Sequence, residues 1–140
     1  MIEIITGISS VIIALFGYKE KLSQAKRQRR HDIADYFEEV GKTLAELHAE
    51  LEARRYPHGK CQEVADLAAR MPDALGRDII TNVEELVKLL KKVHEVEQLF
   101  QPLDQLNDSE RDTQLAIIAG AVGVINALAT SVRAGYSGAA

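Results

Sequence analysis

Apolar residues between Asp32 and Arg55 recur every three or four positions. Steps of 4, 3, 4, 3 and 4 residues separate Ile33, Phe37, Val40, Leu44, Leu47 and Leu51. Residues with this spacing lie on one side of an α-helix, so the pattern predicts a helix that buries one face. Asp32 is expected to cap its start, and "YPHG" at 56–59 to end it, because proline lacks the amide hydrogen that a helix needs.

Three further segments have helical spacing. They cover about Lys60 to Arg70, about Asp78 to Phe100, and a stretch from near Asn107–Ser109 to about Arg133. "MPDALG" at 71–76 is expected to end the first segment and Pro102 the second, while Gly135 suits the end of the third. Thr81 and Glu84 fit a capping box within the second segment.

No stretch alternates apolar and polar residues for long enough to form a strand. The predicted fold class is therefore all-α, an antiparallel four- to five-helix bundle with an apolar N-terminal helix. Residues 1–134 are expected to form a single domain, with 1–18 as the apolar helix and 135–140 as a flexible C-terminal tail. No breaker separates Tyr18 from Asp32, so the first two helices are either continuous or turn near residues 23–31.

The last predicted helix carries no charge between Thr113 and Val132. Such a helix either lies deep in the bundle or enters a membrane. Its length permits both, and the polar residues Gln114, Asn126 and Thr130 favour the bundle.

The first helix is also uncharged, from Ile4 to Tyr18, and it has two sides. A broad apolar face is formed by Ile4, Ile5, Ile8, Val11, Ile12, Leu15 and Phe16, and a narrower stripe by Glu3, Thr6, Ser10 and Gly17 with Ile13 among them. The apolar face either packs on the core or inserts into lipid. If several copies inserted together, Glu3, Thr6 and Ser10 would line the pore, and a ring of carboxylates would favour cations.

A basic cluster follows at once. Residues 19–30 contain Lys19, Lys21, Lys26, Arg27, Arg29 and Arg30 against the single acid Glu20, in a chain whose net charge is −4. We expect these six residues to contact anionic lipid if the cluster is functional, and to be a solvated face if it is not. Nucleic acid is not expected as a partner, because the cluster has no interleaved aromatic residues and the remaining chain is acidic.

Residues with catalytic spacing are scarce. No glycine-rich phosphate loop and no Gly-x-Ser-x-Gly motif occurs, and no acidic residue lies three positions before a histidine, as a di-metal bundle requires. His48 with Glu52, or His94 with Glu97, could hold one edge of a metal site. Cys61 is either a small core residue or the partner of His58 in a thiolate–imidazole pair. We predict no enzyme, no metal and no cofactor.

An apolar N-terminal helix with scattered Gly and Ser, followed by a helical bundle, resembles the HeLo-type membrane-targeting domains of fungal cell-death proteins. It is similar also to the bacterial Bell domains, and to the four-helix bundles of necroptosis executioners and some plant immune receptors. The resemblance implies a pore-forming or membrane-permeabilising domain of a cell-death or defence system. An oligomerising signal would release the first helix, residues 2–18, into the membrane.

Several expectations follow from this resemblance. The protein would be a homo-oligomer when active, and it would move from the cytoplasm to the inner face of the membrane; one cysteine, which permits no internal disulfide, suits that compartment. "GYSGAA" at 135–140 carries no amyloid signalling motif, so the chain is either an excised domain or has a separately encoded signalling partner. The alternative is a soluble helical adaptor without membrane activity.

Overall fold

The computed structural model describes residues 3–76, 88 and 96–135, and within them it contains six helices and no strand. The helices are α1 (Glu3–Phe16), α2 (Lys19–Ser23), α3 (Arg27–Glu52), α4 (His58–Leu75), α6 (Val96–Asp104) and α7 (Asp108–Ala134). The prediction of an all-α fold is therefore confirmed. Most of the segment predicted as a helix from Asp78 to Phe100, including Thr81 and Glu84, lies outside the described residues, as does the tail 136–140.

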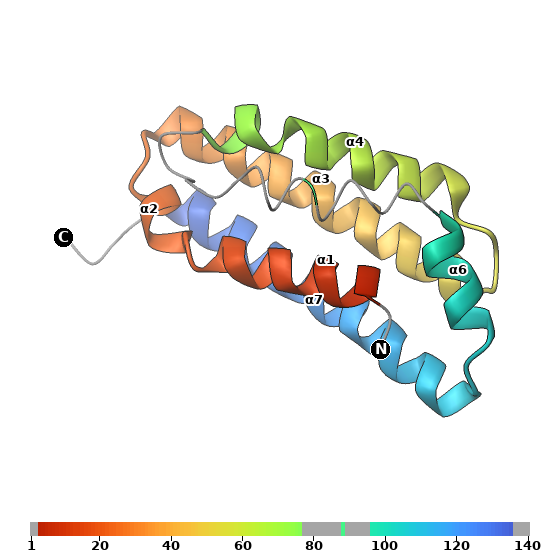
Figure 1. Cartoon of the computed structure of the whole chain (residues 1–140). Helices are drawn as coiled ribbons and strands as arrows, with labels where there is room; N and C mark the ends of the chain where they lie inside the picture. Colours follow the sequence, from red (N-terminus) through yellow and green to blue (C-terminus); the bar gives the residue numbers. More distant parts are fainter. Residues whose placement is uncertain (1–2, 77–87, 89–95, 136–140) are drawn as a thin grey trace.

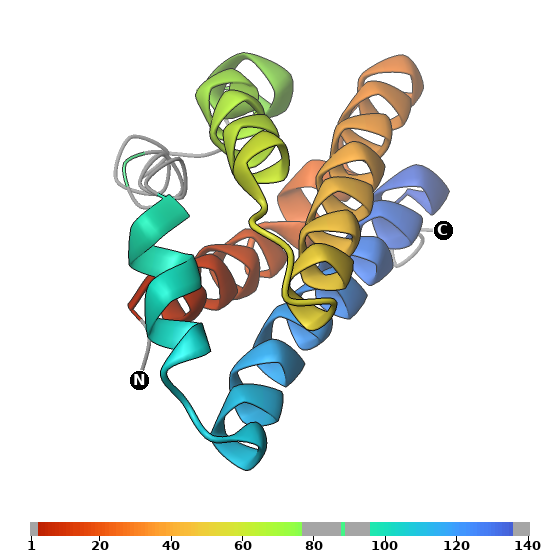
Figure 2. The same ribbon diagram turned by 90° about the vertical axis from the view of Figure 1, so that its right-hand side faces the viewer.

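The helices pack on a central pair, α3 and α7. The most extensive contact is between α3 and α7. α4 packs on α3, and both α1 and α2 pack on α7, which lies behind α1 in Figure 1. Figure 2 views the bundle from the end at which α6 crosses it. Every helix of the described chain contributes at least two apolar side chains to the core, except α2, which contributes Leu22.

A glycine of α3 lies against side chains of α7. Gly41 is buried in the middle of α3, and a side chain there would collide with Asn126 and lie 3.1 Å from Cγ2 of Ile125. Glycine at position 41 leaves room for both of these side chains, whereas a larger residue would displace at least that of Asn126.

The first of the two turns near the N-terminus separates α1 from α2 at Gly17–Tyr18, and the second separates α2 from α3 at residues 24–26. The second turn lies within the range that the sequence left open. The prediction that Asp32 caps α3 is wrong, since α3 begins at Arg27 and Asp32 accepts a hydrogen bond from Gln28 over 3.1 Å within the helix. Nothing between 27 and 32 interrupts the helical ladder.

Two prolines lie inside helices that they were expected to end. α4 continues through Pro72 to Leu75, and α6 continues through Pro102 to Asp104. A proline inside a helix removes one hydrogen bond. Burial of the next leucine in each helix, Leu75 in α4 and Leu103 in α6, offsets that loss.

The predicted ends of α7 are confirmed. The side chain of Asn107 accepts a hydrogen bond from the amide of Glu110 over 2.8 Å, as an N-cap does. Gly135 ends the helix with a φ of 86°, in the left-handed region that glycine adopts at little cost.

Candidate functional site

Six of the seven apolar residues assigned to membrane insertion are part of the core. Ile4, Ile5, Ile8, Val11, Ile12 and Leu15 are each exposed by 8% or less, whereas the seventh, Phe16, is 39% exposed. These residues could therefore reach lipid only if α1 left its place beside α7.

The polar stripe of α1 is divided between the interior and the surface. Ser10 is exposed, whereas the hydroxyl of Thr6 is buried and has no hydrogen-bond partner among the described residues. The side chain of Glu3 lies outside the described part of the chain. A buried hydroxyl without a partner destabilises the packed position of α1 by about 1–3 kcal/mol.

Two of the six basic residues bind helix ends. The guanidinium group of Arg30 donates to the carbonyl oxygens of Arg133 over 3.0 Å and of Ala25 over 3.1 Å, and Arg29 donates to the carbonyl of Leu75 over 3.3 Å. The carbonyl groups of Leu75 and Arg133 lie in the last turns of α4 and α7. Carbonyl groups there lack partners within the helix, and a positive charge beside them is stabilising. Arg29 and Arg30 therefore fasten the start of α3 to the ends of α4 and α7.

The end of α7 is also held by its own arginine. Arg133 donates to Asp35 and to Glu38 on α3, each over 2.8 Å, and lies 3.1 Å from Nδ1 of His31. Hydrogen bonds to these two carboxylates raise the pKa of Arg133. This network secures the junction of α3 and α7 beside the basic cluster.

The other four basic residues point into solvent. Lys19, Lys21, Lys26 and Arg27 are exposed, and none of them forms an ion pair within the described chain. Lys19 lies over the ring of Phe16 at 5.1 Å, and Lys21 lies over the ring of Tyr18 at 6.0 Å. The six predicted lipid contacts thus divide into two that cap helices and four free cations, which have no ion pair among the described residues.

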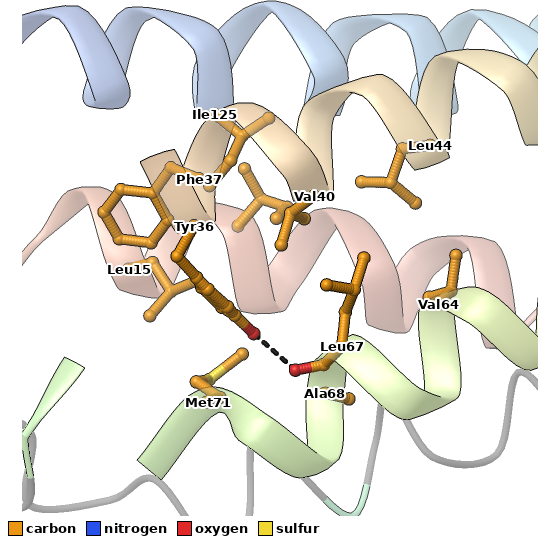
Figure 3. A pocket seen from close by; sticks show the side chains of 11 residues that line it. Leu15, Tyr36, Phe37, Val40, Leu44, Val64, Leu67, Ala68, Met71 and Ile125 are labelled. Carbon is orange, nitrogen blue, oxygen red and sulfur yellow. Dashed lines mark hydrogen bonds between the residues drawn. The ribbon is translucent and has the colours of Figure 1, made fainter. Parts of the chain in front are cut away.

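An apolar seam joins α1 to the rest of the bundle (Figure 3). Ile12 and Leu15 of α1 meet side chains from α3, α4 and α7, and Tyr36 donates its hydroxyl to the carbonyl oxygen of Leu67 over 2.5 Å. The free volume between these side chains is about 10 Å³, close to the lower limit for one water molecule. The seam is therefore a filled core contact and not a ligand site.

Cys61 is buried in this core, and burial raises the pKa of its thiol to about 12. A thiol with that pKa stays protonated at neutral pH and is a poor nucleophile or metal ligand. The structure therefore places Cys61 as a small core residue and not in a thiolate–imidazole pair with His58.

Metal ligands do not converge in the described chain. His48 and Glu52 lie 3.5 Å apart on α3, and no third histidine, cysteine or acidic side chain among the described residues completes a site with them. His94 and the side chain of Glu97, the other predicted pair, lie outside the described part of the chain.

Sequence reasoning missed a buried arginine. Arg111, 6% exposed, donates to the carbonyl oxygen of Leu51 in the last turn of α3, while its Nε has no partner among the described residues. Arg111 thus ties the start of α7 to the end of α3. The sequence signal that could have indicated its burial is its position, one turn inside an otherwise amphipathic helix.

One helix in the described chain is long and apolar enough to cross a membrane, namely α7. Less than half of its apolar window, 39%, is buried in the bundle. Length and composition alone are weak evidence of a membrane span, since the core helix of a soluble protein has the same properties. Compared with known proteins, the chain matches no family model, no curated protein and no solved structure.

Proposed function

We propose that this protein is a membrane-targeting, membrane-permeabilising helical domain of a cell-death or defence system. It acts as a homo-oligomer. Each copy is an antiparallel bundle that releases α1 into an anionic membrane. The observation that carries the proposal is the pairing of a strongly apolar α1 with free cations directly after it. Lipid replaces the core around the six buried apolar side chains at little net change. The gain comes from Phe16, up to about 1.5 kcal/mol, and from each nearby cation, about 1 kcal/mol on an anionic leaflet.

The geometry of α1 suits release. A two-residue turn at Gly17–Tyr18 joins it to α2, whose Leu22 is fully buried. The arginine contacts of α3 lie beyond this turn, so α1 can leave while α2 and α3 keep their places. The hydroxyl of Thr6, which has no partner among the described residues, lowers the cost of departure.

A charge at Phe16 tests the proposal, because Phe16 is the one member of the inserting face that the bundle leaves accessible. Phe16→Asp should leave the protein folded and slow dye release from phosphatidylglycerol-containing vesicles at least about tenfold, since a carboxylate opposes insertion. Tyr56→Asp is the matched control: Tyr56 is 51% exposed and follows α3 at the far end of the bundle. Equal release by both variants would refute a role for α1 in the membrane.

The second candidate is a soluble helical adaptor. It is favoured by the burial of six apolar residues of α1, which makes this helix a structural element. The adaptor predicts no dye release and no affinity for vesicles, with partner binding or self-association in buffer instead.

A further inference from the structure

The outside of α1 carries two large apolar side chains that the bundle does not cover. Ile13 is 62% exposed and Phe16 is 39% exposed, and apart from Tyr56 no other large apolar residue of the described chain is exposed. Ile13 and Phe16 are three residues apart, so they are neighbours on the helix surface.

Free cations border these side chains. Lys19 and Lys21 belong to α2, the short helix that follows α1. Lys19 lies over the ring of Phe16, and Lys21 lies over the ring of Tyr18. Neither lysine has an acidic partner within the described chain. We name Ile13, Phe16, Lys19 and Lys21 the elbow surface.

We infer that the elbow surface docks the folded protein on an anionic bilayer while α1 is still packed against α7. The inference rests on the proposed function and names the surface that makes first contact. Apolar side chains bordered by ammonium groups suit the boundary of a bilayer, where the side chains enter below the headgroups and the ammonium groups meet phosphates.

Charge complementarity favours an anionic bilayer as the partner of the elbow surface, over a second copy of this acidic protein. Lys26 and Arg27, which are also exposed, follow within six residues of Lys21, so four cations accompany one acid, Glu20, in residues 19–27. The chain as a whole has a charge of −4, so an anionic surface repels most of the molecule and attracts this end. Docking in this way uses none of the six buried side chains of α1.

The test measures binding of the full chain to vesicles of phosphatidylcholine with phosphatidylglycerol by flotation. Lys19→Ser with Lys21→Ser should weaken binding about thirtyfold, and Ile13→Ser about tenfold. The matched controls are Lys42→Ser with Arg55→Ser, which change the net charge equally, and Tyr56→Ser. Control variants should bind within about twofold of the parent chain. Thermal unfolding verifies that each variant is folded.

Hydrogen exchange of the bound protein decides whether α1 stays packed. Amides of α7, on which α1 packs, should exchange just after vesicle binding as slowly as in the free protein, whereas departure of α1 would expose them. Loss of that protection on first contact, or equal binding by the elbow variants and the parent, would overturn the inference. Self-association in buffer that Ile13→Ser abolishes, with no vesicle binding, would overturn it too and make the elbow surface a contact between copies.

Dye release separates this inference from the proposed function. Docking that depends on the elbow surface, without dye release, would support the inference and count against permeabilisation. Dye release by elbow variants that bind as tightly as the parent would overturn the inference and leave the proposed permeabilisation in place.

Discussion

Arg30 and Arg27 have the same side chain and lie one turn apart, yet their environments differ. Arg30 donates to carbonyl groups of Arg133 and Ala25, and its guanidinium group occupies the space that a side chain at Gly135 would need. Arg27 is exposed. At the scale of the residue, therefore, one arginine stabilises the fold and the other is available to a partner.

Replacing each arginine by alanine should separate the two roles. Arg30→Ala should lower the free energy of unfolding by about 2 kcal/mol, because two hydrogen bonds from a charged donor are lost. Arg27→Ala should change it by less than about 0.5 kcal/mol. Urea unfolding measures both values. Equal destabilisation by the two variants would contradict the assignment of Arg30 as a helix cap.

The thiol of Cys61 should make the fold sensitive to alkali. Its pKa rises from the usual 9.0 to about 12 on burial, so between these values the folded state keeps a proton that the unfolded state releases. Stability from this group is therefore complete below pH 9 and is lost as the pH rises toward 12. Burial also raises the pKa of Tyr36, which acts in the same direction.

Cys61→Ala isolates the contribution of the thiol. The variant should be about 1 kcal/mol less stable at neutral pH, because a core atom is removed, and should lose less further stability than the parent above pH 9. Urea unfolding at a series of pH values measures this. Parallel pH curves for variant and parent would show that Cys61 is not buried as a thiol.

At the scale of the element, the buried and the exposed side of α1 should differ in how far a substitution destabilises the fold. Ile8→Ala should cost about 2–4 kcal/mol, because Ile8 is 1% exposed, whereas Ile13→Ala should cost less than about 0.5 kcal/mol. Chemical denaturation of both variants measures the difference. If Ile8→Ala were as mild as Ile13→Ala, α1 would not be packed on the bundle in solution.

Sequence patterns predicted elements better than they predicted element ends. The three- and four-residue spacing located α3 and α7, and the capping residues located both ends of α7, since each of these signals acts within a few residues. The helix ends predicted at Pro72 and Pro102 were wrong. A proline shows in the sequence that one hydrogen bond is lost, but the burial of Leu75 and Leu103, which offsets this loss, depends on distant helices.

The candidate site followed the same rule. Its residue types and the two sides of α1 were legible in the sequence, but the division of the basic cluster was not. Arg29 and Arg30 find their acceptors 46 and 103 residues further along the chain. No spacing within residues 19–30 reports where those carbonyl groups lie.

At the scale of the whole molecule, the proposed pore is an assembly of several copies. Dye release should therefore rise more steeply than in proportion to the amount of vesicle-bound protein, because several docked copies must meet before the membrane opens. Release rates measured against bound protein over a dilution series check this expectation. A strictly proportional dependence would indicate that single molecules disturb the membrane.

The sequence by itself determined the helical class, the caps of α7, the apolar and polar sides of α1 and the cations that follow it. Those properties come from periodicity and capping, which involve neighbouring residues. Only the tertiary structure decided that six side chains of α1 lie in the core, that Ile13 and Phe16 remain outside, and that Arg29, Arg30 and Arg111 cap other helices. Burial and long-range hydrogen bonds depend on which helices meet, and this is set by the packing of the whole chain.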